Sequence, residues 1–233
     1  MEDLDKCKNI ALTLFDVLPI KTHPVYPFLL DSHVFIKEKF YPYHGNIVDI
    51  TTNDAVRAEC VNQWKTIIMN AGSVDDLFCL VQEKYQLTFM SYIRNYVDNT
   101  TFSKFLHDAW LYTENGNQDV NVDISEITTW FEDADKSVLM SKEDYAYYKK
   151  LPQVVTIYRG VSQHGTYYGM SWTDDREKAE WFWNRFNGYT EDASTYLLTA
   201  NVSKDDILAY FNDRDERELV VNIEAIKDGI VEI

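Results

Sequence analysis

The chain has 233 residues, of which 45% are hydrophobic and 15% aromatic, which is ample for a folded core and excludes a disordered segment. Its formal net charge of −16 argues against a broad nucleic-acid surface, because such surfaces depend on lysine and arginine side chains that neutralise phosphates. We therefore expect protein or small-molecule partners, with any bound dinucleotide held by a locally placed cation.

The first 150 residues are mainly helical in pattern. Residues 1–50 begin with a short amphipathic stretch and continue through prolines and aromatic residues, so they predict only an extended lead-in. From Asp54 apolar side chains recur at helical spacing as far as Gly72, a typical helix stop, and residues 115–117 predict a turn. Further helices are expected to begin at four polar residues: Ser73, Thr101, Asp123 and Ser141. Residues 51–150 therefore predict a helical lobe.

The pattern changes after residue 150. Runs of β-branched and aromatic residues favour four strands, at 154–158, 195–200, 207–211 and 219–223. One helix interrupts them, and we expect it to begin near Asp174 with Glu177 completing a capping box. Its apolar stripe predicts core residues, namely Ala179, Phe182, Trp183 and Phe186. The whole chain predicts an α+β fold, with residues 151–233 as a separate core.

Cysteine usage and the chain start bear on compartment. Cys7, Cys60 and Cys79 are odd in number, far apart and set in helix-like segments, which favours reduced core residues over disulfides or a thiolate metal site. The first residues lack the basic start and apolar stretch of a secretory signal, and no apolar run approaches the roughly 20 residues that span a bilayer. We therefore expect a cytoplasmic site of action and no membrane partner.

Two acids, Glu216 and Glu218, stand at the head of the run 219–223. On a strand, the period of two would place both carboxylates on one face and Arg217 on the other. Taken alone, such a pair in an acidic chain is most simply the solvated face of an edge strand. Its interest comes from two motifs upstream.

The first of these motifs contains Arg159, which follows the predicted strand on its apolar side, so that a planar fork suited to phosphate projects from that face. The adjacent Gly160 would let the backbone approach a ligand closely. In the second motif, Ser171 and Thr173 flank Trp172 just before the predicted helix. An arginine at a strand end and hydroxyls that cap a helix are the plain alternatives for these motifs.

In this order the three motifs resemble those of the ADP-ribosyltransferases of the arginine, serine, glutamate class, over about residues 141–226. The resemblance implies a split, mixed β-sheet core with a cleft for NAD. It also implies that Arg159 holds the NAD phosphates, that Gly160 contacts the nicotinamide amide through its backbone, and that Ser171 positions the catalytic Glu218. Glu216 matches the first acidic position of members that modify arginine.

The middle motif is Ser-Trp-Thr rather than the usual Ser-Thr-Ser of that class. Trp172 and Thr173 would complete the NAD-binding segment, and Trp172 or Tyr168 would contact the nicotinamide ring. Residues 211–215 correspond to a loop that helps to recognise the acceptor. His164, between the first two motifs, is a further candidate for the wall of the cleft.

The resemblance predicts an enzyme that cleaves NAD and transfers ADP-ribose to a protein, at arginine, in a toxin-like or phage-encoded setting that includes the host cytoplasm. The same residues would serve an NAD glycohydrolase with water as acceptor. A non-catalytic acidic phage or bacterial inhibitor that keeps the fold is the alternative from another class. No metal site is expected, since the five histidines are scattered.

Overall fold

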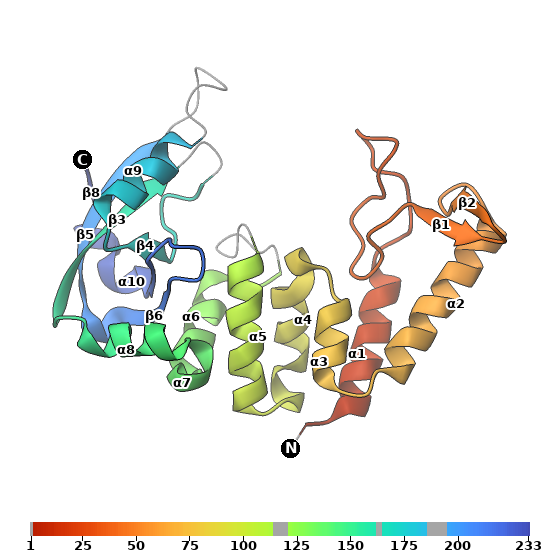
Figure 1. The fold of residues 1–233 in the computed structure, drawn as a ribbon, viewed down its shortest axis with the longest axis horizontal. Helices are drawn as coiled ribbons and strands as arrows, with labels where there is room; N and C mark the ends of the chain where they lie inside the picture. Colours follow the sequence, from red (N-terminus) through yellow and green to blue (C-terminus); the bar gives the residue numbers. More distant parts are fainter. Residues whose placement is uncertain (1, 114–120, 162–164, 186–194) are drawn as a thin grey trace. The chain divides into compact units, whose positions relative to one another are not determined.

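The structure is a computed structural model that describes residues 2–113, 121–161, 165–185 and 195–233 (Figure 1). The chain forms two compact units. The first comprises Met1–Phe105 and Leu111–Thr113, and the second Leu106–Trp110 and Glu114–Ile233. No helix in the described ranges is both long enough and apolar enough to cross a membrane.

The first unit is largely helical, around a core rich in phenylalanine. The rings of Phe78 and Phe105 stack with their centroids 4.2 Å apart. Its helices and two short strands are α1 (Leu4–Val17), β1 (Phe40–Tyr43), β2 (Asn46–Asp49), α2 (Asp54–Asn70), α3 (Val74–Leu80), α4 (Gln86–Ile93) and α5 (Asn99–Tyr112), with 3-10 turns at Glu83–Tyr85 and Arg94–Tyr96. The strands β1 and β2 form an antiparallel hairpin.

The expectation of an extended lead-in is wrong for the first helix. Asp3 caps α1 by accepting a 3.0 Å hydrogen bond from the backbone nitrogen of Lys6. The residues that α1 buries share one helical stripe: Cys7, Ala11, Leu14 and Phe15. Burial of that stripe against α2, α3 and α4 stabilises the helix.

Several predicted helix starts are confirmed. Ser73 forms a capping box with Asp76 at the start of α3. The helix α5 begins at Asn99, two residues before the predicted start. In the second unit, Asp123 caps α6 (Ile124–Asp133) and Ser141 caps α8 (Lys142–Lys150). The turn predicted at 115–117 lies outside the described residues.

Helices α6, α7 (Lys136–Leu139) and α8 belong to the second unit, so the predicted boundary at residue 150 differs from the one observed. The physical reason is their packing on the sheet. Tyr147 of α8 stacks on Tyr210 with ring centroids 4.3 Å apart, and Lys136 donates a 2.6 Å bond to the carbonyl of Leu208. Within this unit His107 bonds Leu139 O at 2.8 Å.

In the part of the chain that the structure describes, the second unit has one sheet with the strand order β6-β7-β4-β3-β5-β8. The strands are β3 (Val154–Val161), β4 (Ser171–Thr173), β5 (Tyr196–Ser203), β6 (Ile207–Phe211), β7 (Glu218–Val221) and β8 (Val231–Glu232). All recorded neighbours pair antiparallel, so the expected mixed sheet is wrong. The α+β class is confirmed.

Strands β3 and β4 meet at one residue pair only, Tyr158 with Thr173, whereas β3 pairs with β5 from Val154 to Val161. The sheet is therefore nearly divided into two halves beside the end of β3. The short turns and helices that complete the unit are α9 (Arg176–Asn184), a 3-10 turn at Lys204–Asp206, α10 (Ile223–Ile226) and a 3-10 turn at Lys227–Gly229.

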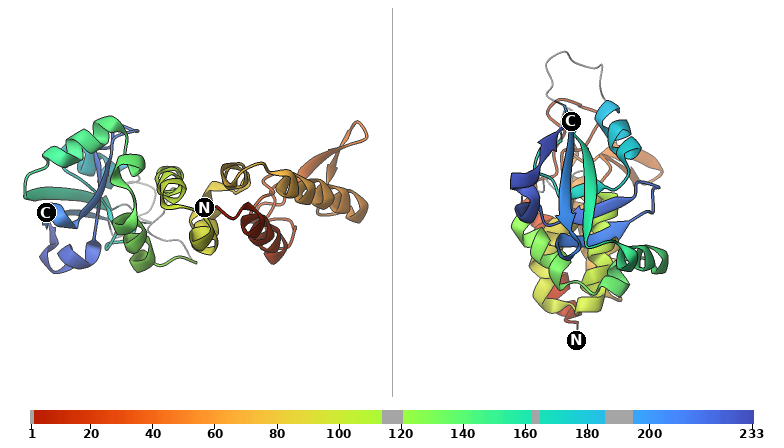
Figure 2. Two further views of the ribbon diagram at one scale, coloured as in Figure 1. Left: turned by 90° about the horizontal axis from the view of Figure 1, so that it is seen from below. Right: turned by 90° about the vertical axis from the view of Figure 1, so that its left-hand side faces the viewer.

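Helix α9 lies along β3, as two views show (Figures 1 and 2). A Cβ added at Gly160 would lie 2.1 Å from the carbonyl oxygen of Ala179 and 2.4 Å from the backbone nitrogen of Trp183. The absence of a side chain at Gly160 therefore allows the strand and the helix backbone to approach each other.

Two local predictions in this unit need correction. Asp175, not Asp174, caps α9, because Asp174 instead binds Arg217. The predicted strand 219–223 begins at Glu218 and ends at Val221, since Asn222 caps α10 by accepting a 3.2 Å bond from Glu224 N. The three cysteines are free, but Cys79 is exposed rather than part of the core.

Candidate functional site

Glu218, at the start of β7, is the centre of the candidate site. Its side chain is buried, and its Oε1 accepts hydrogen bonds from the Ser171 hydroxyl and, at 2.9 Å, from Trp110 Nε1. Burial raises the pKa of the carboxyl, while the bonds from Ser171 and Trp110 oppose that rise. The site therefore holds a desolvated carboxylate whose charge is supported by two fixed donors.

Trp110 was not predicted as a site residue. It lies on α5, in the stretch Leu106–Trp110 that belongs to the second unit, and its ring packs edge-on against Phe131 with centroids 5.0 Å apart. In the sequence the helical spacing of Trp110 indicates only a core residue. A further indication is general: the N–H of a buried indole needs a hydrogen-bond acceptor.

Arg159 lies close to Ser171, the residue whose hydroxyl bonds Glu218. Its Nη1 donates to the carbonyl of Ser171 at 2.5 Å and its Nη2 to the carbonyl of Thr166 at 3.0 Å, while Nε is buried and has no partner among the described groups. Val155 and Ile157, on the same side of β3, are buried as predicted, and the fork binds two backbone carbonyls. The pairing of β3 with β4 does not extend to Ser171, so Ser171 O is not part of the ladder between these two strands.

The segment that carries Thr166 lies directly over this guanidinium. A Cβ added at Gly169 would lie 2.3 Å from Arg159 Nη2, so only glycine fits there without a shift. Burial lowers the pKa of Arg159 to about 10, and the nearby charge of Glu218 opposes that shift. The pKa values of Arg159 and Glu218 are thus both shifted chiefly by burial, each toward the neutral form.

Three residues predicted to bind the cofactor have structural contacts instead. Trp172 is 2% exposed and donates a 2.8 Å bond to the carbonyl of Gly169, so its ring is not accessible as a stacking surface. Thr173 bonds the carbonyl of Glu216 at 3.2 Å and the nitrogen of Asp175 at 3.1 Å. Gly160 is packed on α9, as described above. Tyr168, the other predicted ring contact, is 56% exposed.

Glu216 does not share a strand face with Glu218, which corrects the prediction of paired carboxylates. Asp215 and Arg217 adopt φ values of 55° and 51°, and such left-handed residues interrupt a strand. Glu216 therefore lies in a loop, where its Oε2 accepts a 3.0 Å bond from Arg214 Nη2. Arg217 turns away and donates to Asp174 through Nε and Nη2 at 2.8 and 2.9 Å.

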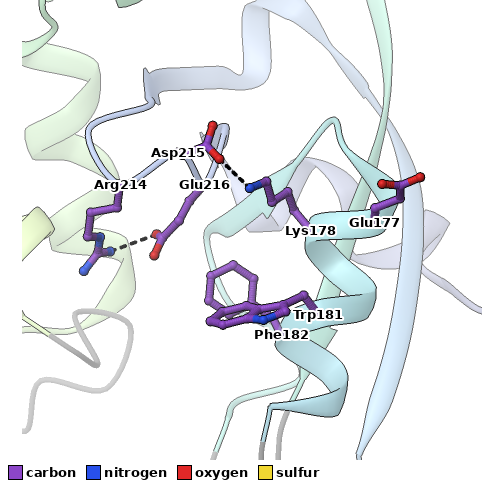
Figure 3. A pocket seen from close by; sticks show the side chains of 7 residues that line it. All are labelled: Glu177, Lys178, Trp181, Phe182, Arg214, Asp215 and Glu216. Carbon is purple, nitrogen blue, oxygen red and sulfur yellow. Dashed lines mark hydrogen bonds and ion pairs between the residues drawn. The ribbon is translucent and has the colours of Figure 1, made fainter.

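A cavity of about 370 Å³ lies between this loop and α9 (Figure 3). Arg214 and Glu216 line it from the loop, and Trp181, which is 55% exposed, and Phe182 line it from the helix. The lining is completed by Glu177 and by the ion pair of Lys178 with Asp215, at 2.7 Å.

The predicted core positions of α9 are met only in part. Ala179 is buried, but Phe182 lines the cavity, and Trp183 is half-buried with a 3.1 Å bond from its Nε1 to Thr195 Oγ1. Phe186 and His164 lie outside the described residues. The described ranges contain no group of three or more histidine, cysteine, aspartate or glutamate residues that could hold a metal ion.

In the structure Arg159 bonds the backbone carbonyl of Ser171, the Ser171 hydroxyl bonds Glu218, and Thr173 bonds the backbone carbonyl of Glu216. No family model, no curated protein and no solved structure matches this chain. The function of this chain is therefore inferred from the geometry of the second unit.

Proposed function

We propose that this chain cleaves NAD and transfers the ADP-ribose group to an arginine of a protein. The observation that supports the proposal is that Ser171 bonds both Arg159, through its carbonyl, and Glu218, through its hydroxyl, although the three residues come from three separate motifs and three separate strands. An ordinary strand end, an ordinary helix cap and an ordinary surface acid would have no reason to be linked in this way.

The chemistry assigned to Glu218 follows from its setting. Cleavage of the bond between nicotinamide and ribose builds positive charge on the sugar, as in glycoside hydrolysis, where a carboxylate stabilises an oxocarbenium-like transition state. A carboxylate that accepts two fixed bonds in a buried site stabilises that charge more than a solvated one does. Ser171 and Trp110 keep the orientation of the group fixed.

Arg159 supplies the cation that NAD phosphates need in a chain of net charge −16. Its fork is engaged by Ser171 O and Thr166 O, so binding of a phosphate requires the segment around Gly169 to move and these bonds to be exchanged. Such an exchange keeps each donor partnered, which limits its cost in free energy.

Glu216 is assigned to the acceptor. An acceptor guanidinium is protonated, because its pKa lies above roughly 12, so it needs a nearby acid to orient it and to receive a proton. Glu216 lines a cavity that has aromatic side chains on the opposite wall, Trp181 and Phe182. A planar cation fits between a carboxylate and aromatic rings.

The test is incubation of the purified protein with labelled NAD and a cell lysate. We expect labelled protein with the wild-type chain, and at least a roughly hundredfold slower reaction with Glu218→Gln, since loss of one such electrostatic contact costs about 3 kcal/mol. Glu143→Gln, an exposed acid on α8, is the matched control and should react as the wild type does. Intact NAD and unlabelled protein would refute the proposal.

Two other outcomes identify the alternatives. Free ADP-ribose without labelled protein would indicate an NAD glycohydrolase that uses the same residues. The second alternative is a non-catalytic acidic protein. The bonds of the Arg159 fork to two backbone carbonyls favour it. In that case Glu218→Gln would leave biological activity unchanged. We also propose that the protein acts in the cytoplasm, which includes the cytoplasm of a phage host.

A further inference from the structure

Arg214 binds Glu216, the acid that orients the acceptor guanidinium in the proposed function. Its Nη2 lies 3.0 Å from Glu216 Oε2, and its side chain is 53% exposed, so the rest of the guanidinium is accessible. The arginine is therefore bound to Glu216 and still open to solvent.

The loop that carries Arg214 is held at several points. Asp215 N bonds Asn212 O at 3.0 Å, Arg217 N bonds Asn212 Oδ1 at 3.1 Å, and Asp215 pairs with Lys178 at 2.7 Å. The two positive φ values turn the chain so that Arg214 and Glu216, two residues apart, reach into the same cavity (Figure 3). Their contact is thus built into the turn and does not depend on two freely moving side chains.

We propose that Arg214 is itself an acceptor of ADP-ribose, modified by the site of its own chain. The inference rests on the proposed function, in which Glu216 orients an acceptor guanidinium. The guanidinium of Arg214 already lies in that position beside Glu216. An acceptor held beside the reacting groups has a large advantage over one that must diffuse to them.

The step balances without any further reactant. The bond between C1′ of the ribose and the nicotinamide nitrogen breaks, and its electron pair leaves with neutral nicotinamide. An Nη of Arg214 forms the new bond to C1′, and the proton that this nitrogen loses passes to Glu216. The products are nicotinamide and a chain that carries one ADP-ribose group on Arg214.

Other arginines of the second unit are placed differently. Arg217 is held by Asp174 and donates a 2.7 Å bond to the Tyr147 hydroxyl, and Arg159 is bound to two carbonyls. Arg176 is exposed but pairs with Glu180 along α9, at 2.8 Å. The inference therefore predicts modification at one position, with Arg176 as a matched exposed control.

The experiment is incubation of the purified wild-type chain with NAD alone, followed by intact mass and peptide mapping, with a small guanidine compound as external acceptor in a parallel sample. We expect one ADP-ribose on Arg214, with a fraction of chains modified per unit time that does not depend on protein concentration. Arg214→Lys should remove the modification, and Arg176→Lys should retain it. Glu218→Gln should abolish both reactions.

The outcomes separate this inference from the proposed function. If nicotinamide is released and the guanidine compound is modified while Arg214 stays unmodified, the inference is wrong and the proposed function stands. Modification at Arg176 or Arg217 in place of Arg214 also overturns it, as does a fraction modified per unit time that rises in proportion to protein concentration. If NAD stays intact under all conditions, both fail.

Discussion

The indole Nε1 of Trp110 lies 2.9 Å from Oε1 of Glu218, the same oxygen that accepts the hydroxyl of Ser171. The two donors come from a helix and from a neighbouring strand, 108 and 47 positions away in the sequence. They hold one oxygen of the carboxylate and leave Oε2 for another partner. Trp110 is therefore a positioning residue for the acid on which the proposed chemistry depends.

Trp110→Phe should shift the pH dependence of NAD cleavage. The ring still packs on Phe131, but a donor to the ionised form of Glu218 is lost, so the pKa of Glu218 rises further above its usual value. Because the active form is ionised, activity falls as pH falls through that pKa, and the acid limb of kcat/KM should move to higher pH. Nicotinamide release measured against pH provides the test.

Other charges near Glu218 do not change in this variant: Glu216 and Arg214 from the loop and Arg159 from β3. Phe131→Leu is the control, since it loosens the packing of Trp110 but keeps the indole N–H. It should lower stability and leave the acid limb in place. Equal pH profiles for Trp110→Phe and the wild type would show that the bond does not influence Glu218.

Gly160→Ala should destabilise the second unit. The new Cβ would meet the backbone of α9 at Ala179 and Trp183, and a helix backbone cannot turn aside as a side chain can. Such overpacking costs about 1–3 kcal/mol in the free energy of unfolding. Gly229→Ala is the matched control, because a Cβ there meets nothing within 4 Å, and its effect should stay within about 0.5 kcal/mol. Urea unfolding of both variants measures the difference, and equal stability would contradict this account of Gly160.

Arg217→Lys should loosen the loop before β7. Arg217 binds both oxygens of Asp174 through two nitrogens, a geometry that lysine cannot reproduce, although its side chain is 36% exposed and solvent weakens the pair. We expect a loss of about 1 kcal/mol in the free energy of unfolding. We expect the activation free energy of ADP-ribose transfer to rise by more than this amount. Arg176→Lys, in a surface pair with Glu180, should cost less than about 0.5 kcal/mol. If both variants behave alike in unfolding and in transfer, the loop does not depend on Arg217.

The expectation that Arg159, Ser171 and Glu218 lie near one another came from the resemblance of the three motifs to a known family, since each motif alone favoured a plain structural role. The strand Ile207–Phe211 has the predicted bounds because its apolar pattern is a local feature. Glu216 could not be placed this way, since nothing in non-glycine residues at 215 and 217 indicates a positive φ.

Long-range contacts account for most other differences. Asp174 and Asp175 are equally suitable caps by local chemistry, and the choice is made by Arg217, 43 positions away from Asp174. The role of Trp110 depends on a bond across 108 positions, which no local pattern reports. Helix α1 is a different case, because its buried stripe at Cys7, Ala11, Leu14 and Phe15 has helical spacing and was available to sequence reasoning.

In the first unit, a buried histidine should make stability fall in mild acid. His33 Nδ1 accepts bonds from the backbone nitrogens of Phe35 and Ile36, at 3.1 and 3.0 Å, so the proton sits on Nε2, which donates to Phe15 O at 3.1 Å. Protonation of Nδ1 would break the turn. Burial lowers the pKa of His33 from 6.5 to about 4, against weaker effects of Phe15 O and Asp16 that raise it.

The sign follows from proton binding. Between pH 6.5 and about 4 the unfolded chain holds a proton on His33 that the folded chain does not, so the free energy of unfolding falls as pH falls through this range. A shift of this size corresponds to about 3 kcal/mol in total. His33→Asn keeps an acceptor oxygen but does not titrate, so it should be less stable than the wild type near neutral pH and lose less stability on acidification. Urea unfolding at several pH values, followed by helical circular dichroism, tests this, and parallel acid dependence in the two proteins would show that His33 is not the group responsible.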